Sequence, residues 1–370
     1  EGAGVFKLAP PSGYLALCTA NLPEPTIGPN SDTQADDHFN TALRSGFGSS
    51  GGSVTVGFKP DWVWEKTRSH SSYNTLWDSG RGLPKHLYSN LSNVEGDSTW
   101  LTAFASNGLT YGTNDYSDSV NLVVWNWKAN GGTATATISE SGNNPAASVQ
   151  ANPTAGFSLI TYTGTGGAGT IAHGLGAVPK MMIIKNRDVS DAWAVYHGEN
   201  TSAPETDYLT LNEAYATADH NTVWNDTAPT SSVFTIGTAH SVNADGEKYV
   251  AYVFAEIEGY SKFGSYTANA NANGPFVDTG FQPAWIMIKQ SNGTVNWNIY
   301  DNKRSVGGGS PNDLELYADL NEAEYDSGRE IDFLSNGFKL RTVNYVNLSG
   351  GIYVYMAFAK NPFKYATGIL

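Results

Sequence analysis

The sequence predicts an all-β protein made of three tandem β-sandwich-like repeat units of about 100 residues each. Two observations lead to this prediction. A ten-residue pattern occurs three times, at residues 57–66, 176–185 and 280–289. Runs rich in Val, Ile, Thr, Tyr and Trp also alternate with clusters of Gly, Asn, Asp and Ser, and helical periodicity is almost absent. Chains built from copies of one unit more often bind or build than catalyse.

The repeated pattern predicts a buried strand. In each copy a Gly lies three residues before a Pro, a Lys lies six residues after it, and an apolar run separates Pro from Lys. Pro can open a strand, where its missing N–H does least harm, and the apolar run is typical of a strand buried on both faces. Pro60, Pro179 and Pro283 are therefore expected at equivalent strand starts. The first copy departs from the others because Glu65 precedes its Lys.

Further strands follow in the same order in each unit. An opening strand is expected at residues 38–43, 157–163 and 263–267, and each unit closes on an aromatic strand at residues 123–128, 249–256 and 353–360. Alternate residues of a strand share one face. Trp127, Phe254 and Phe358 are therefore predicted to be equivalent core residues.

These matches divide the chain at two places. Units are expected at residues 36–130, 155–258 and 259–370, the last including a C-terminal tail. Residues 131–154 are rich in Gly, Ser, Thr and Asn and predict a linker with one small hairpin, so the first unit is expected to hinge against the other two. Residues 1–35 do not match the repeat. They are typical of an exit segment from an upstream domain followed by a Pro-rich connector.

Composition excludes several classes of partner. The 21 Lys and Arg residues against 35 Asp and Glu residues give a formal net charge of −14. This balance argues against nucleic acid and against anionic membrane surfaces, whereas neutral sugars and divalent cations stay possible. No apolar run reaches the roughly 18 residues that a membrane-spanning helix needs. Cys18 is the only cysteine, so no intrachain disulfide can form.

An aromatic residue followed by Asp, with Arg three residues later, occurs at the end of the second strand in the first and third units. An aromatic face, a carboxylate and a guanidinium could together form a sugar platform. The alternative is a strand-end salt bridge that fixes the following loop, because features repeated at equivalent positions usually serve the fold. The second unit has Tyr–His there and no Arg. The candidate ligand-binding residues are Trp77, Asp78, Arg81, Tyr196, His197, Tyr300, Asp301 and Arg304, with the loop at residues 68–73.

No pattern predicts catalysis, a cofactor or a metal site. The acidic residues are scattered and show no arrangement that marks a catalytic pair. None of the seven His has a partner at metal-ligand spacing. Residues 114–118 (Asn-Asp-Tyr-Ser-Asp) could offer loop oxygens to Ca²⁺, but they lack the spacing of a twelve-residue calcium loop.

Residues 11–27 resemble the connector that follows a SPRY domain in large virion proteins of tailed bacteriophages, especially marine ones. The Gly-Phe-x-Pro-x-Trp-Val-x-x-Lys strand and Val-Trp-Asn-Trp-Lys-Ala at residues 124–129 are similar to the β-rich domain found downstream there. The resemblance covers nearly the whole chain. It implies a structural virion protein, such as a tail fibre or tail-associated projection for host-surface glycan recognition. It also implies other virion proteins as partners and a homo-oligomer, expected to be a trimer. A capsid decoration or head fibre protein and a polysaccharide depolymerase are the alternatives.

Overall fold

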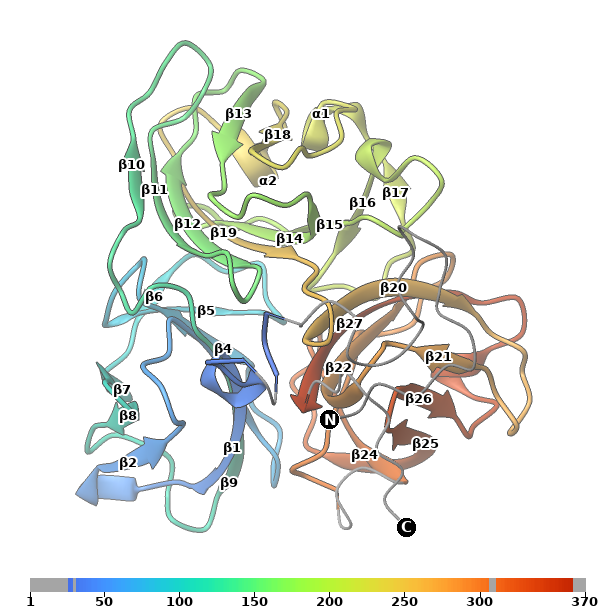
Figure 1. Ribbon diagram of the computed structural model, residues 1–370. Coiled ribbons are helices and arrows are strands. Elements are labelled where there is room, and N and C mark those ends of the chain that lie inside the picture. The colour runs from blue at the N-terminus through green and yellow to red at the C-terminus, as the bar shows by residue number, and fades with distance from the viewer. Residues whose placement is uncertain (1–25, 29–30, 306–310, 362–370) are drawn as a thin grey trace, which may run out of the picture.

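A computed structural model describes residues 26–28, 31–305 and 311–361 and is all-β, with three large antiparallel sheets around a common centre (Figure 1). The expected exit segment, most of the Pro-rich connector and the C-terminal tail lie outside the described residues. The helices are short: α1 (Asn221–Trp224) and α2 (His240–Asn243), with 3₁₀ turns η2 (Ala35–Asp37), η3 (Gly48–Ser50), η4 (Pro204–Thr206) and η5 (Tyr345–Asn347). Within the described residues, no helix is both long and apolar enough to cross a membrane.

The first sheet has a second layer on one face. Its strands are β1 (Phe39–Ser45), β3 (Trp62–Thr67), β4 (Thr75–Asp78), β5 (Lys85–Tyr88), β6 (Gly96–Asp97) and β9 (Asn121–Trp127), in the order β1-β9-β3-β4-β5-β6. The second layer consists of β2 (Gly52–Thr55), β7 (Leu101–Ala105) and β8 (Gly108–Tyr111), in the order β2-β8-β7. Val54, Leu109 and Trp77 belong to a buried cluster between the layers. This part of the chain is therefore a small sandwich.

The second sheet has eight strands. They are β10 (Ala136–Ile138), β11 (Ala147–Asn152), β12 (Phe157–Thr163), β14 (Pro179–Asn186), β15 (Ala194–His197), β16 (Asp207–Thr210), β17 (Ala218–Asp219) and β19 (Lys248–Ala255), in the order β10-β11-β12-β19-β14-β15-β16-β17. The pair β13 (Gly169–Ala172) and β18 (Val233–Ile236) forms a separate two-stranded sheet. Ile171 and Phe234 of this pair are buried in one cluster with Ile160 of β12.

The third sheet also has eight strands. They are β20 (Ser261–Thr267), β21 (Phe276–Asp278), β22 (Gln282–Gln290), β23 (Asn298–Asp301), β24 (Asn312–Tyr317), β25 (Tyr325–Leu334), β26 (Gly337–Leu340) and β27 (Ile352–Asn361), in the order β20-β27-β22-β23-β24-β25-β26-β21. Here β24 to β26 and β21 continue the sheet, whereas the other two sheets have separate small layers.

Five strands follow the same order in all three sheets: opening strand, closing strand, the strand of the repeated pattern and the two strands after it. The strand of the repeated pattern begins at Pro179 in the second sheet and one residue before Pro283 in the third, whereas in the first it begins at Trp62, two residues after Pro60. The registers match as well, since Trp62 pairs with Trp127, Met181 with Phe254, and Trp285 with Phe358. The strand of each repeated pattern lies in the middle of its sheet and is almost wholly buried, as predicted. In the first sheet this strand is also central, although it contains a Glu.

The segment predicted as a linker with one small hairpin forms a hairpin, but this hairpin belongs to the second sheet. Residues 131–154 contain β10 and β11, and β11 pairs along its whole length with β12. Val149 and Ala151 point into the core of the second sheet and are buried. The Gly, Ser, Thr and Asn content of this segment concealed its short apolar alternation, and it forms the edge of the second sheet.

A central aromatic core joins the three sheets. The stacked rings of Trp62 and Tyr252 lie 4.4 Å apart, and those of Phe39 and Phe358 lie 5.1 Å apart. The closing strands of the second and third sheets also meet, through Phe254 and Phe358 at 6.1 Å. The prediction that Trp127, Phe254 and Phe358 are core residues is confirmed, because each is 1% exposed. The first sheet is thus packed into the same core as the other two, and the expected hinge between them is not seen.

Candidate functional site

All eight predicted ligand-binding residues lie in the interior. Trp77, Asp78, Tyr300 and Asp301 have no exposed surface, and the most exposed of the set, Arg81, retains 9%. Tyr196, His197 and Arg304 are buried as well. The predicted sugar platform therefore does not hold for these side chains, because a ligand at the surface cannot reach their rings or charges.

Their geometry matches the alternative, a strand-end salt bridge. Asp78 accepts hydrogen bonds from the Arg81 backbone N–H at 2.7 Å and from its Nε at 2.5 Å, while Arg81 Nη2 donates to the carbonyl of Leu76. Asp301 and Arg304 repeat the arrangement at 3.0 and 2.6 Å. Charge-assisted bonds of this kind are among the strongest hydrogen bonds in proteins. They fix the turn after the second strand in the first and third sheets.

The residue at the end of this second strand, which is Asp78, His197 or Asp301, also joins neighbouring sheets. We call the contact region between two large sheets a seam. At the first–second seam, the hydroxyl of Tyr252 donates to Asp78 at 2.7 Å. At the third–first seam, the indole N–H of Trp125 donates to Asp301 at 3.0 Å. At the second–third seam, His197 replaces the carboxylate and its Nε2 lies 3.0 Å from the carbonyl oxygen of Tyr355. Each sheet therefore contacts the closing strand of the next, in a closed cycle.

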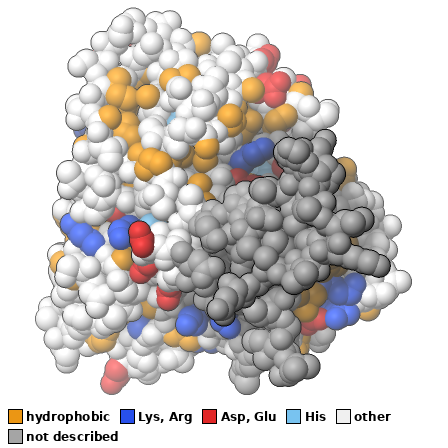
Figure 2. Space-filling view, in the orientation of Figure 1, with side chains coloured by type: hydrophobic (Ala, Val, Ile, Leu, Met, Phe, Trp, Pro, Cys, Tyr) orange, Lys and Arg blue, Asp and Glu red, His pale blue; other side chains and the backbone are white. Residues whose placement is uncertain are grey.

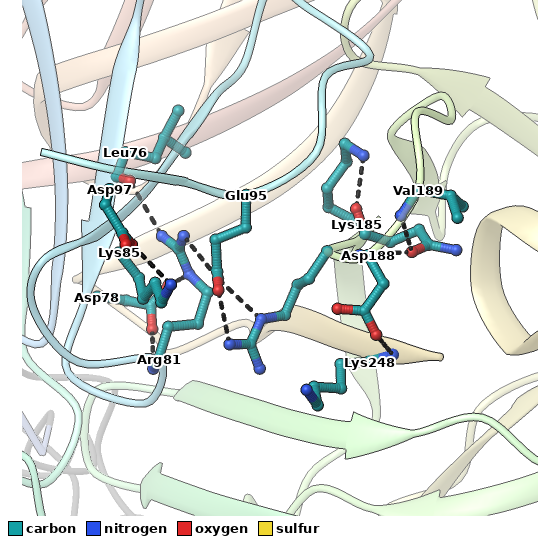
Figure 3. A network of polar contacts seen from close by, with 12 residues as sticks. Leu76, Asp78, Arg81, Lys85, Glu95, Asp97, Lys185, Asp188, Val189 and Lys248 are labelled. Carbon is teal, nitrogen blue, oxygen red and sulfur yellow. Dashed lines mark hydrogen bonds and ion pairs between the residues drawn. The ribbon is translucent and has the colours of Figure 1, made fainter. Parts of the chain in front are cut away.

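A second carboxylate crosses the first–second seam. Glu95 lies between two guanidinium groups, 3.4 Å from Arg81 and 2.8 Å from Arg187 of the second sheet. Figure 3 shows Asp78, Arg81 and Glu95 converging from strands β4 to β6 and the turns between them. The backbone N–H of Glu95 also donates to the carbonyl of Arg187 at 2.9 Å. The first–second seam is therefore held by charged side chains and by backbone.

The third–first seam repeats this network, and the second–third seam has a neutral version. Glu324 lies 3.1 Å from Arg304 and 2.7 Å from Arg68, and its backbone N–H donates to the carbonyl of Arg68 at 2.9 Å. At the second–third seam, the hydroxyl of Thr217 donates to Asn200 at 2.7 Å, and the N–H of Thr217 donates to the carbonyl of Ser291. The backbone contact is thus common to all three seams, and the charges occur at two of them.

Sequence reasoning missed the partners that complete the seams. Arg68 and Arg187 each lie two residues after a repeated Lys. Trp193 and Trp297 each lie eight residues after one, and their indole N–H groups donate to the carbonyls of Tyr88 and Thr210 in neighbouring sheets. Extending the repeat alignment past the Lys would have selected these four positions.

Burial shifts the pKa of several seam groups. It lowers the pKa of His197 to about 4, so this imidazole is neutral at neutral pH. Its Nδ1 accepts from the backbone N–H of Glu199, which leaves Nε2 as the donor to the carbonyl across the seam. Burial acts to lower the pKa of Arg81, but the charge of Asp78 outweighs it and raises that pKa above its usual value.

The three repeated lysines are buried and bonded to carbonyl oxygens. Burial lowers the pKa of Lys66 to about 7 and of Lys185 and Lys289 to about 8. Their ammonium groups donate to the carbonyls of Ser72, Asn186 and Gln290 at 2.5, 2.5 and 2.7 Å. These lysines hold the turn that follows each central strand.

The remaining candidate, the loop at residues 114–118, is bound by the protein itself. Arg44 binds both carboxylate oxygens of Asp115 at 2.6 and 2.9 Å, and the N–H of Phe47 donates to the same group. Arg44 also pairs with Glu65, the residue that departs from the repeat, at 2.8 Å. Among the described residues, no three His, Cys, Asp or Glu side chains lie close enough together to hold a metal ion.

Comparison with known proteins assigns the family and no activity. No curated protein and no solved structure matches the chain. A family model described as a domain of unknown function matches residues 34–362, a range that includes all three large sheets. Since this range is most of the chain, the protein belongs to the DUF7483 family.

Proposed function

We propose that the chain is a structural, non-enzymatic protein of a tailed bacteriophage virion. It serves as a tail fibre or tail-associated projection that recognises host-surface glycans. The resemblance to domains downstream of SPRY domains motivates this proposal. The observation that carries it is the burial of every predicted ligand residue, with Asp78, His197 and Asp301 bonded across the seams, since the repeated charges and aromatics of the chain are used to build a rigid scaffold.

The scaffold consists of three copies of one β-sandwich-like unit closed into a ring. Three similarities support this: the strand order, the register between the closing strand and the strand of the repeated pattern, and the cyclic contacts at the seams. Convergent folding of three unrelated segments would not place Asp78, His197 and Asp301 at the same seam position.

Recognition uses loops and not the shared strands, because loops on a rigid scaffold carry most binding residues. Two loops meet at the outer edge of the third–first seam, where the N–H of Ser72 donates to the carbonyl of Asn321 at 2.8 Å. Tyr73 and Tyr325, on or beside these loops, are 45% and 58% exposed. Tyrosine offers a flat apolar face and a hydroxyl, which suits a sugar ring.

Surface charge favours a weakly charged partner. The face in Figure 2 shows Lys and Arg beside Asp and Glu and no broad basic area among the described residues. With a net charge of −14, the chain lacks the electrostatic footprint of a nucleic-acid-binding or membrane-binding protein. Host glycans and other virion proteins are its partners, and it works as a homo-oligomer, expected to be a trimer.

The test uses purified chain and host cells. The Tyr73→Ala/Tyr325→Ala double variant should adsorb to host cells at least about tenfold more weakly than the wild-type chain, a loss that corresponds to two stacking contacts. Tyr215→Ala is the matched control, because Tyr215 is 62% exposed but belongs to a loop of the second sheet. Equal adsorption of all three proteins would contradict the assignment of these loops.

The two alternatives have distinct outcomes. If the wild-type chain does not adsorb to host cells and labelling places it on the capsid of intact particles, it is a decoration or head fibre protein. If it releases reducing sugar from host polysaccharide, it is a depolymerase.

A further inference from the structure

One polar side chain recurs beside all three seams and is a carboxyl at only one of them. At the first–second seam, the side-chain oxygen of Asn212 accepts from the backbone N–H of Trp193 at 2.8 Å. Asn90 does the same for the equivalent residue of the first unit, at the third–first seam, at 2.9 Å. At the second–third seam the acceptor is Asp319, 3.0 Å from the backbone nitrogen of Trp297. A carboxyl therefore takes the place of two amides.

Each of these side chains positions a residue that crosses its seam. The indole N–H of Trp193 donates to the carbonyl of Tyr88 in the first sheet at 3.1 Å, and that of Trp297 donates to Thr210 in the second sheet at 2.9 Å. Asp319 is only 6% exposed. The state of this buried carboxyl therefore bears directly on the second–third seam.

The second carboxyl oxygen of Asp319 lacks a partner. Oδ2 is buried and forms no hydrogen bond with any residue that the structure describes. The ammonium of Lys289 acts on this carboxyl, but its three N–H groups donate to the carbonyls of Ala214, Gln290 and Gly293 at 3.1, 2.7 and 3.2 Å. An ionised Asp319 would thus place an unpaired negative charge in the interior, which is costly, whereas a protonated one is as neutral as Asn.

The surrounding groups favour the protonated form. Burial raises the pKa of Asp319 from 3.8 to about 7, and Glu213 of the second sheet raises it too, against the opposing effects of the Trp297 N–H and Lys289. Between these two pH values the folded chain holds a proton that the unfolded chain has lost. The stabilisation by this proton is therefore complete below pH 3.8 and is lost as pH rises to about 7.

We propose that Asp319 makes the second–third seam a pH-sensitive contact: the protonated carboxyl holds Trp297 as an amide would, and loss of the proton loosens the seam. The other two seams lack this response because Asn90 and Asn212 do not titrate. The inference is independent of host recognition, since it concerns only how firmly the second and third sheets are held together.

Direct titration of the wild-type chain tests the first step. The side-chain carboxyl carbon of Asp319, assigned through the backbone by NMR, changes its chemical shift when the proton leaves. Its midpoint should lie about three pH units above the ordinary value of 3.8. A midpoint near 3.8 would overturn the proposal without the need for any variant.

Hydrogen exchange at three equivalent amides tests the second step. The backbone N–H groups of Thr217, Glu95 and Glu324 each donate to a carbonyl across one seam, so their protection reports its opening. Protection is taken relative to an unstructured peptide at the same pH. At Thr217, the ratio of protection in Asp319→Asn to that in the wild type should rise about tenfold for each pH unit between 4 and 7. His197 titrates at the same seam in the opposite sense, but it is present in both proteins and cancels in this ratio.

The matched variant is Asn212→Asp, which moves the carboxyl to the first–second seam. It should make the protection of Glu95 fall with rising pH and leave that of Thr217 as in the wild type. Equal protection of Thr217 in the wild type and Asp319→Asn across this range would overturn the proposal. A change of equal size at all three amides would also overturn it, because the carboxyl would then act on the whole fold and not on one seam.

Discussion

Replacing Asp78 by Ala should destabilise the fold more than its single carboxylate suggests. The change removes three short hydrogen bonds, two from Arg81 and one from Tyr252 across the seam, at 2.5 to 2.7 Å. It also leaves the Arg81 side chain, which has no exposed surface, with only the 3.4 Å contact to Glu95 and one carbonyl. Breaking a buried ion pair by removing one partner costs about 3–5 kcal/mol, and we expect a loss in that range.

Urea denaturation followed by tryptophan fluorescence measures this loss. The matched control is Asp97→Ala, because Asp97 pairs with Lys85 at 2.6 Å in the same sheet but both side chains are exposed. Exposed pairs contribute little to stability, so the control should unfold as the wild type does. An Asp78→Ala variant that matches this control would refute the view that the seam pair holds the sheets together.

Two further predictions concern the seams and the core. Acid should weaken the fold through His197. The pKa of this side chain is about 4 in the folded protein and 6.5 in the unfolded chain, so the unfolded chain binds the proton first. The contribution of His197 to the free energy of unfolding should therefore fall by about 3 kcal/mol as pH falls from 6.5 to 4. The His197→Gln variant should lack this fall in the free energy of unfolding. A variant whose stability falls with acid as steeply as that of the wild type would contradict the role of His197. Phe254→Ala and Phe358→Ala should each cost about 3–5 kcal/mol in urea unfolding, because both rings lie in the central aromatic core. Tyr325→Ala is the exposed control, and a loss as small as that of the control would show that the central core is not closed.

Much of the fold was predictable from local pattern. The Gly–Pro–Lys spacing placed the central strand of each sheet, and the alternation of aromatics in the closing strands identified Trp127, Phe254 and Phe358 as core residues. Both predictions rest on periodicity, which fixes the face of a strand on which a side chain lies. In residues 131–154 the small hairpin was predicted, but its pairing with the second sheet was not, because composition was weighed above the short alternation in β11.

The sequence by itself determined that an aromatic residue, Asp and Arg recur at the same strand end, and that a salt bridge was one reading of them. Only the tertiary structure decided what covers that strand end. Tyr252 lies 174 residues from Asp78, and Trp125 lies 176 residues from Asp301. Spacing within a strand sets the direction of a side chain but carries no information about which distant strand packs on it.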